Sequence, residues 1–352
     1  MLKNLKYFML FLALTVVIYQ NYVNYDKKNT VNVYGWYGII PSHIIKDFKK
    51  ETGISVNYDI YDNNETLEAK LVATANGRNG YDVIFPSLTP YATRQNSIGL
   101  YQKLDYSKIP NTKNLNQEIV KKIGNIDYFI PYFWGTIGIA INEDIVKREL
   151  SWINIDSYDI ILNPSILQHL YKYGVSFPEE FVDIFQQTML YLGLPTNTKN
   201  KKCLESFLNH FKKLRPYITK FSSTTIISDL LNGSICIGIG TSDNIYRAIL
   251  AGKNMGKKIR YILPKEGSVF WLDCMAIPTS APHTENAYKF INYMLKKAIG
   301  EEITKYSGIY TTTSDEKINP EFIMGAKSVT KEDMYFDKAA TRTWSQIRLK
   351  KF

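Results

Sequence analysis

The feature that most constrains the fold is the regular alternation of apolar runs and amphipathic segments between residues 31 and 85. Two amphipathic segments, Ser42–Glu51 and Glu65–Ala75, have the spacing of helices, and Pro41 and Gly53 bound the first one. Three short apolar or alternating runs flank them and predict strands: Val31–Tyr34, Ile54–Tyr61 and Asp82–Phe85. A β-α-β-α-β order of this kind implies a mostly parallel sheet with helices on its faces.

The alternation resumes after a long apolar and aromatic stretch, Ile130–Ile141, which Gly135 and Gly138 interrupt. The elements expected beyond it are a strand at Ile160–Leu162, helices at Glu179–Leu192 and Leu204–Leu214, a strand at Ile235–Ile239, an apolar stretch at Val269–Ile277 and a helix at Thr284–Lys297. With 352 residues, of which 45% are hydrophobic, the chain is long enough for two lobes. We expect two α/β lobes, each a mixed sheet flanked by helices: residues 30–139 with 272–312, and residues 140–271 with 313–352.

The N-terminus has the pattern of an export signal. Two lysines within Met1–Lys6 precede the continuous apolar run Tyr7–Tyr19, which is shorter than the ~20 residues of a spanning helix. We expect residues 1–24 to be a signal peptide or an uncleaved anchor, with a buried N-terminal helix as the alternative. No cysteine follows the run to accept a lipid, so the expected location is the periplasm.

Charge and motifs exclude several functions. The net charge is +10 and the pI about 9.1, but the lysines are scattered through amphipathic stretches and no nucleic-acid-binding motif accompanies them. The three cysteines and four histidines are isolated, which predicts neither a disulfide framework nor a metal site. Phosphate-binding loops and nucleophile motifs are also missing. We therefore expect no cofactor, no nucleic-acid partner and no enzymatic activity.

Candidate ligand-binding residues follow the predicted strands, because ligands of open α/β sheets bind beyond the carboxyl ends of the strands. Trp36 follows the first strand, and its ring is either a surface for a cation or part of the core. Ser87 and Thr89 follow the third strand, and Thr241 and Asp243 follow the strand at Ile235–Ile239. Their hydroxyl and carboxylate groups are suited to holding a polar or cationic ligand.

Two pairs of residues are more informative. Trp271 and Asp273 are two positions apart in an extended segment, so an indole and a carboxylate share one face and suit an ammonium ion. Glu180 and Asp183 are neighbours on a predicted helix and repel each other unless a cation bridges them. The alternative for this second pair is a helix start, in which Ser176 and Glu179 form a capping box and acids complement the helix dipole.

Several stretches together resemble the periplasmic spermidine/putrescine-binding proteins of bacterial ABC polyamine transporters. They are VYGWYGIIP (Val33–Pro41), FKKETGISVNYDIYDNNETLEAKL (Phe48–Leu71), YDVIFPS (Tyr81–Ser87), IPYFWGTIGIAIN (Ile130–Asn142) and LPKEGSVFWLDCMAIP (Leu263–Pro278). The resemblance runs from about residue 30 to the C-terminus. It implies a type II "Venus flytrap" fold that closes on an extended polyamine.

By position, Trp36, Ser87, Trp271 and Asp273 match the family's binding residues by identity. Glu180 and Asp183 match an Asp and a Glu of the family with the two types exchanged, and Trp134 matches a family aromatic.

Other family positions are replaced in this chain. Gly38 and Ile39 stand where the family often has an acid and a tyrosine, Thr89 replaces a tyrosine, and Thr241 replaces a tryptophan. Ile309 aligns with a tyrosine, although Tyr310 is adjacent. Trp344 is retained, and Ser345 or Gln346 supplies the late polar contact. Asp243 is a substitute for a missing acid.

We therefore expect a monomer that captures a polyamine, such as spermidine or putrescine, and delivers it to the permease subunits of an ABC importer. The first alternative is a binding protein for a different small cationic or chelated solute. An enzyme on a similar architecture and a sensor that reports to a membrane receptor are two others. Any cationic ligand requires a locally acidic site in a basic chain.

Overall fold

The computed structural model describes residues 29–61, 63–75, 77, 80–124, 126–179, 181–195, 201–222, 224–313 and 338–349. The expected signal segment, residues 1–24, lies outside them. The chain divides into two compact units. The first unit falls within Met1–Pro86, Arg94–Pro131 and Cys274–Ile299, and the second within Ser87–Thr93, Tyr132–Asp273 and Gly300–Phe352. The lobe boundaries expected from the sequence remain a prediction.

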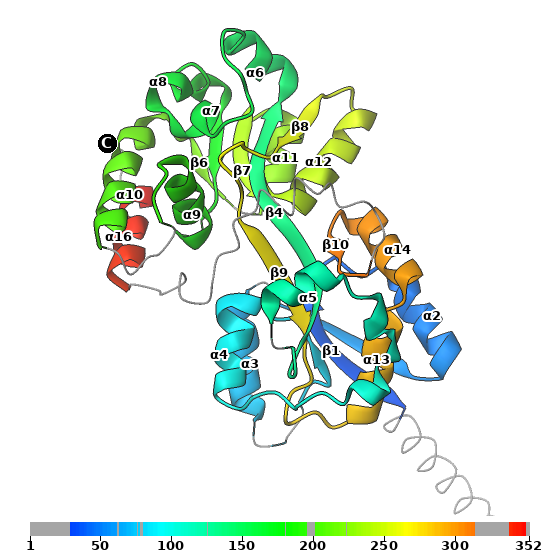
Figure 1. Ribbon diagram of the computed structural model, residues 1–352. Coiled ribbons are helices and arrows are strands. Elements are labelled where there is room, and N and C mark those ends of the chain that lie inside the picture. The colour runs from blue at the N-terminus through cyan, green and yellow to red at the C-terminus, as the bar shows by residue number, and fades with distance from the viewer. Residues whose placement is uncertain are drawn as a thin grey trace, which may run out of the picture. The chain divides into compact units, whose positions relative to one another are not determined.

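The first unit contains the predicted parallel sheet, in the order β2-β1-β3 (Figure 1). Its elements are β1 (Thr30–Trp36), α2 (Ser42–Thr52), β2 (Ser55–Tyr61), α3 (Asn64–Thr74), β3 (Val83–Ile84), α4 (Thr93–Ser97), α5 (Gln117–Ile123) and α13 (Thr284–Met294), with 3-10 turns at Tyr106–Lys108 and Pro110–Asn114. The β-α-β-α-β order predicted for residues 31–85 is confirmed.

Local signals place the ends of the first helices. Helix α2 follows Pro41 and ends at Gly53, which has φ +72° and donates its backbone N–H to the carbonyl of Lys49. A left-handed conformation of this kind favours glycine. Helix α3 begins after Asn63, whose side chain accepts a hydrogen bond of 2.8 Å from the backbone N–H of Thr66.

The second unit is built around a mixed sheet in which β10, β4, β7, β5 and β6 follow one another, with β8 and β9 also paired to β4. Its elements are β4 (Ile130–Asn142), α6 (Glu143–Glu149), α7 (Asp159–Leu162), α8 (Pro164–Leu167), β5 (Val175–Phe177), α9 (Phe181–Tyr191), α10 (Lys201–Leu214), β6 (Lys220–Phe221), α11 (Ile226–Asn232), β7 (Ile237–Thr241), α12 (Ser242–Asn254), β8 (Ile259–Ile262), β9 (Phe270–Met275), α14 (Lys297–Ser307), β10 (Tyr310–Thr311) and α16 (Lys338–Leu349). Strands β4 and β9 and helix α14 also contain residues of the first unit. The predicted mixed α/β class is confirmed.

Two local predictions are wrong. Ile160–Leu162 lies in helix α7 rather than in a strand, and its residues are fully buried. Ser157 Oγ accepts a hydrogen bond from the backbone N–H of Asp159 and so supports a helical turn. A short apolar run that is buried all round has no period that distinguishes helix from strand. The capping box given as the alternative for the Glu180–Asp183 pair is also absent, because Ser176 lies within β5 and helix α9 begins only at Phe181.

An aromatic cluster anchors the C-terminal helix to the second unit. The Trp344 ring of α16 packs edge-on against Phe211 and Phe221, with ring centroids 5.1 Å and 5.4 Å away. Its indole N–H donates a hydrogen bond of 2.8 Å to the carbonyl of Glu179. The late segment of the chain is thereby held beside the start of α9.

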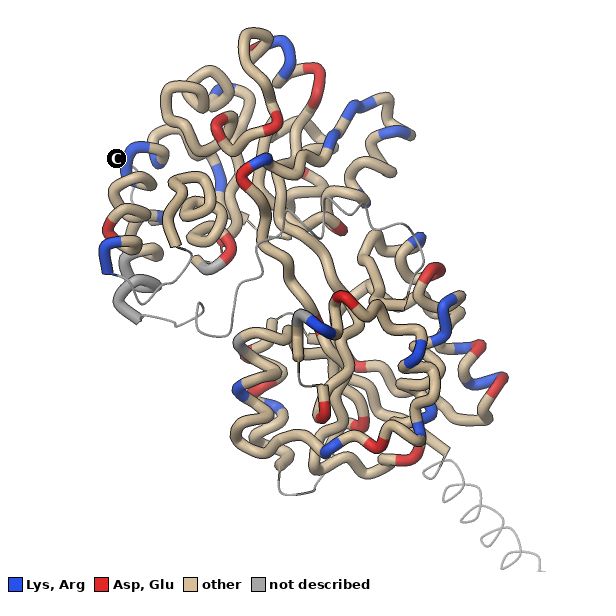
Figure 2. The backbone as a smooth tube through the Cα atoms, viewed as in Figure 1, with Lys and Arg blue, Asp and Glu red and all other residues tan. Residues whose placement is uncertain are grey.

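Charged residues lie on the outer helices and loops of each unit, with acids interspersed among lysines and arginines (Figure 2). Cys203, Cys236 and Cys274 are buried and form no disulfide in the described chain, and burial raises the pKa of the Cys236 thiol to about 12. Within the described ranges, no helix is long and apolar enough to cross a membrane. No group of three or more metal-ligating side chains occurs in those ranges either.

Candidate functional site

Asp273 is a buried carboxylate at the centre of the predicted set. It lies in β9, its residue is 5% exposed, and Ser87 Oγ donates a hydrogen bond of 2.7 Å to its Oδ1. The two residues also form an isolated antiparallel bridge. Ser87 precedes a helical turn, Leu88–Ala92, in which Thr89 keeps an extended backbone. The fold thus brings together Ser87 and Asp273, which are 186 positions apart in the sequence.

The Trp271 indole lies beside Asp273 on the strand and rests against the backbone of β4. A Cβ added at Gly135 would lie 2.5 Å from Trp271 Cζ2 and 2.7 Å from Ser242 Oγ. Ser242 Oγ in turn accepts a hydrogen bond of 3.2 Å from the backbone N–H of Thr136. Gly135 is therefore required for the close approach of the indole and of the start of α12 to the same strand.

A second stack of aromatic rings lies on the same part of β4. The register of β10 on β4 places Tyr310 opposite Trp134, and their rings stack with centroids 4.6 Å apart and planes 22° apart. Phe270 packs on the Trp134 ring with centroids 5.4 Å apart. The indole N–H groups of Trp134 and Trp271 are buried without a hydrogen-bond partner in the described chain. Since ammonium groups are also donors, only the ring faces are suited to a cation.

The start of α12 presents a carboxylate that is already paired. Asp243 is 7% exposed, and Arg247, one turn later, places its Nη2 3.3 Å from Asp243 Oδ2. Arg247 Nη2 also donates a hydrogen bond of 2.6 Å to Asn244 Oδ1, and Asn244 Nδ2 donates one of 3.0 Å to Thr241 Oγ1. Thr241, Asp243, Asn244 and Arg247 therefore form one network.

Tyr261 of β8 connects this network to the aromatic stack. Its hydroxyl lies 2.8 Å from Thr136 Oγ1 and its ring covers Gly138. Burial raises the pKa of the Tyr261 hydroxyl well above its usual value, and nearby Tyr310 and Asp243 raise it further. Asp243 thus lies close enough to the Tyr261 hydroxyl to raise its pKa.

The remaining predicted residues of the second unit that the structure describes lie on helices α9 and α16. Asp183 is half-buried in the first turn of α9, and Glu180 falls outside the described residues. Ser345 and Gln346 lie on α16, where Ser345 is half-buried and Gln346 exposed. The contact of Trp344 with Glu179 brings that helix to the start of α9.

In the first unit, Trp36 belongs to an aromatic row. Its ring packs on Tyr61 with centroids 4.5 Å apart, Tyr61 contacts Tyr34, and Tyr34 stacks on Tyr81 at 4.4 Å. Its indole N–H is likewise buried without a partner in the described chain. Trp36 itself is half-buried at the end of β1.

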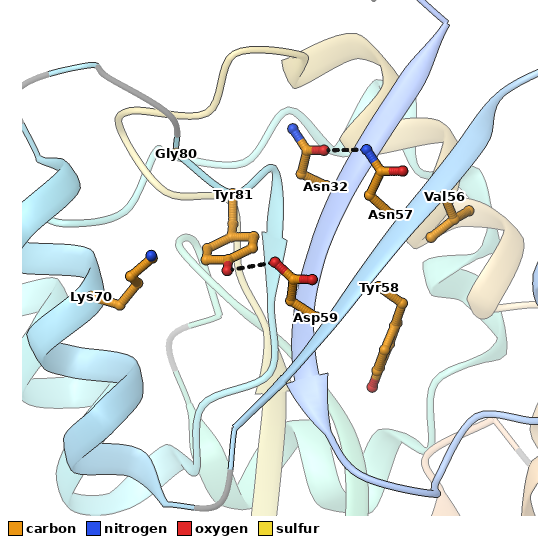
Figure 3. Close-up of a pocket in the computed structure, with 8 residues that line it drawn as sticks. All are labelled: Asn32, Val56, Asn57, Tyr58, Asp59, Lys70, Gly80 and Tyr81. Atoms are coloured by element: carbon orange, nitrogen blue, oxygen red, sulfur yellow. Dashed lines mark hydrogen bonds between the residues drawn. The ribbon is translucent and has the colours of Figure 1, made fainter.

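A separate polar pocket of about 760 Å³ also lies in the first unit (Figure 3). Asp59 accepts a hydrogen bond of 2.8 Å from the Tyr81 hydroxyl there, and Asn57 donates one of 3.0 Å to Asn32. Lys70 of α3 lies on the same side. No predicted site residue lines this pocket.

Two compact α/β units, with the Asp273 carboxylate and the Trp271 indole two positions apart on β9, agree with a solute-binding protein. Residues 43–327 match the family described as bacterial extracellular solute-binding protein, and the chain belongs to that family.

Its relatives are similar over most of their length. The putrescine-binding periplasmic protein SpuD of Pseudomonas aeruginosa is 39% identical over 345 residues, which cover 92% of each chain. The spermidine/putrescine-binding periplasmic protein of Escherichia coli is 32% identical over 288 residues, covering 81% of this chain and 78% of that one. Among solved structures, the spermidine/putrescine ABC transporter substrate-binding protein PotD of Streptococcus pneumoniae has a TM-score of 0.75 at 25% identity, covering 91% and 98%.

Sequence reasoning missed three residues of this arrangement. Arg247 was detectable as the i,i+4 partner of Asp243 on an expected helix. Gly135 was noticed only as an interruption of an apolar stretch, and nothing in the sequence indicated which ring it faces. No local sequence pattern identified Tyr261, because the Thr136 side chain that its hydroxyl contacts is 125 positions away.

Proposed function

We propose that this chain captures a polyamine in the periplasm and delivers it, as a monomer and without chemical turnover, to the permease subunits of an ABC importer. The observation that most directly supports this function is the buried Asp273 carboxylate, which accepts a hydrogen bond from Ser87 and lies two positions from Trp271 on β9. The names of the relatives, which are putrescine- or spermidine-binding proteins, support the same ligand class.

The chemistry of the ligand fits these groups. A polyamine is an alkyl chain with an ammonium at each end, so it needs separated acids and apolar walls. Asp273 pairs with one amine, and a charge-assisted hydrogen bond at a site with little water is stronger than a surface pair. Glu180 and Asp183 hold an amine at one end of the chain, with Ser345 or Gln346 as the late polar contact.

The indole rings supply the apolar walls. Trp271 packs on the methylene groups and attracts the adjacent cation, an interaction worth roughly 0.5–2 kcal/mol. Tyr310 and Thr89 extend these surfaces. Ser87 fixes the orientation of Asp273, so that the carboxylate meets the ligand without first losing conformational freedom.

The test is Asp273→Asn, which keeps the shape and the Ser87 contact but removes the charge. Calorimetric titration with putrescine and spermidine should show affinity at least tenfold weaker, because a hydrogen bond to a charged group contributes roughly 1.5–3 kcal/mol. Asp144→Asn is the matched control, since Asp144 lies on α6 of the same unit with a side chain 62% exposed. Unchanged affinity in Asp273→Asn would remove the basis of the assignment.

The alternative ligand class is tested on the wild-type protein. Titration with amino acids, thiamine and ferric citrate beside the polyamines separates the two functions. Binding of one of these solutes in preference to every polyamine favours the alternative.

A further inference from the structure

We propose that the polar pocket of the first unit is a second binding site, which takes a short peptide with free termini, extended along the open edge of strand β2 (Figure 3). This inference goes beyond the proposed polyamine function, because no residue predicted to bind the polyamine lines this pocket. It depends on three features of the pocket: a strand edge, a polar sheet face and a cation of helix α3.

The first feature is the edge of the sheet. Among the described strands, β1 is the only neighbour of β2. The backbone N–H of Ser55, the first residue of β2, donates a hydrogen bond of 2.8 Å to the carbonyl of Asn29, the residue before β1. Since the backbone groups of successive strand residues point to alternate sides, those of Val56 and Tyr58 point away from β1, and both residues line the pocket. An extended peptide pairs with an edge of this kind.

The second feature is the sheet face, where polar side chains keep hydrogen-bonding capacity. Asp59 Oδ2 accepts a hydrogen bond of 2.8 Å from the Tyr81 hydroxyl, and Asp59 Oδ1 has no partner in the described chain. Asn57 Nδ2 donates one of 3.0 Å to Asn32 Oδ1, which leaves the Asn32 amide N–H groups and the Asn57 side-chain carbonyl without partners among the described residues. The pocket thus offers a carboxylate oxygen to an ammonium, and an amide donor and acceptor to peptide groups.

The third feature is the ammonium of Lys70. This residue of α3 lines the pocket on the same side of the sheet as Asp59 and Tyr81 (Figure 3). It is exposed, and no residue of the described ranges forms an ion pair or a hydrogen bond with its side chain. Lys70 would repel a polyamine, and Asp59 would repel an inorganic anion. A ligand with both an ammonium and a carboxylate is attracted by both residues.

The strand edge favours a peptide over a free amino acid. A single amino acid carries both charges but has no peptide group to pair with Val56 and Tyr58. A peptide of two or three residues carries backbone groups for the edge, an ammonium for Asp59 and a carboxylate for Lys70. The pocket volume of about 760 Å³ lies within the range of small-molecule sites, roughly 300–1,000 Å³.

The experiment is calorimetric titration of the wild-type protein with trialanine and with four relatives of it: the N-acetylated peptide, the C-terminal amide, a peptide N-methylated at both peptide nitrogens, and free alanine. Trialanine should bind with a dissociation constant of about 1 mM or tighter. Blocking either terminus should weaken binding about threefold, the size expected for an exposed charge pair. The N-methylated peptide should bind about threefold weaker or worse, because it cannot donate hydrogen bonds to the edge. Free alanine should bind more weakly than trialanine for the same reason.

Two variants assign the two termini of the peptide. In Lys70→Gln, amidation of the peptide should no longer weaken binding, whereas acetylation still should. Asp59→Asn should show the reverse pattern. Both positions are exposed, so that the melting temperatures should stay close to that of the wild type. Lys289→Gln, at an exposed lysine of α13 in the same unit, is the matched control and should respond to both blocking groups as the wild type does.

Three outcomes overturn the inference. One is a wild type that binds no trialanine. Another is free alanine or the N-methylated peptide binding as tightly as trialanine. The third is terminal blocking that costs the same affinity in Lys70→Gln and Asp59→Asn as in the wild type.

Putrescine titration of the same variants separates this site from the polyamine site. Their putrescine affinity should equal that of the wild type, and a loss of putrescine affinity in Lys70→Gln would also overturn the inference. A wild type that binds trialanine but no polyamine refutes the proposed function alone.

Discussion

At the scale of single residues, close contacts restrict the side chains of the candidate site. Asp273 is fixed by Ser87, Asp243 by Arg247, and Trp271 by the absence of a side chain at Gly135. The identities of Asp273 and Trp271 were predictable from their spacing of two in an extended segment. Their partners Ser87 and Gly135 were not, because each lies more than 100 positions away in the sequence.

Gly135→Ala tests the packing of Trp271. The new methyl group would lie 2.5 Å from Trp271 Cζ2, and either the ring or Ser242 must shift. We expect about 1–3 kcal/mol of destabilisation in urea unfolding, the usual cost of overpacking, and weaker polyamine binding. Adding Trp271→Phe, which removes the clashing ring, should restore part of the stability but not the binding. Wild-type stability and affinity in Gly135→Ala would show that β4 accommodates the methyl group.

At the scale of elements, helix packing in the second unit depends on buried polar contacts as well as on the apolar core. His210 of α10 is half-buried, and its Nε2 donates a hydrogen bond of 2.7 Å to the carbonyl of Leu162 at the end of α7. Burial is the main reason that the pKa of His210 is lowered from 6.5. The folded protein therefore holds this imidazole neutral at a pH where the unfolded chain protonates it.

The pH dependence of stability follows from that difference. A depressed pKa in the folded state means that His210 contributes stability above pH 6.5, and that this contribution is lost as the pH falls below 6.5 toward the folded pKa. In His210→Gln, the free energy of unfolding should decrease less between pH 7.5 and pH 5.5 than in the wild type. His43→Gln, at an exposed histidine of α2, serves as the control. Equal decreases in wild type and His210→Gln would contradict the assignment.

At the scale of the whole molecule, a net charge of +10 is compatible with a cationic ligand. The Debye length is ~8 Å at physiological ionic strength, so lysines on outer helices act weakly on a ligand that touches Asp273. The charged groups that touch the ligand, rather than the net charge of the chain, determine the sign of the electrostatic potential at the ligand. Figure 2 shows lysines and arginines spread along the helices and loops of both units, with acids between them.

A ligand that binds the folded chain and not the unfolded chain increases the free energy of unfolding. At a putrescine concentration ~100-fold above the dissociation constant, the gain is about 2.7 kcal/mol, which raises the melting temperature by several degrees. The melting temperature of Asp273→Asn should rise much less at the same putrescine concentration. Free lysine, added as a control solute, should raise the melting temperature of neither protein. Equal shifts in the wild type and Asp273→Asn, measured by differential scanning fluorimetry, would indicate that putrescine acts elsewhere.

The α/β class and the parallel character of the first sheet were predictable from the sequence, which also supplied the candidate acids and indoles of the proposed site. Each of these follows from short-range periodicity, from capping residues or from resemblance. Tertiary structure alone decided that Ile160–Leu162 is a helix, since burial on all sides removes the periodic signal. It also decided that Ser87 holds Asp273 and that Gly135 faces Trp271, because contacts between distant segments are set by how strands pair and pack rather than by local propensity.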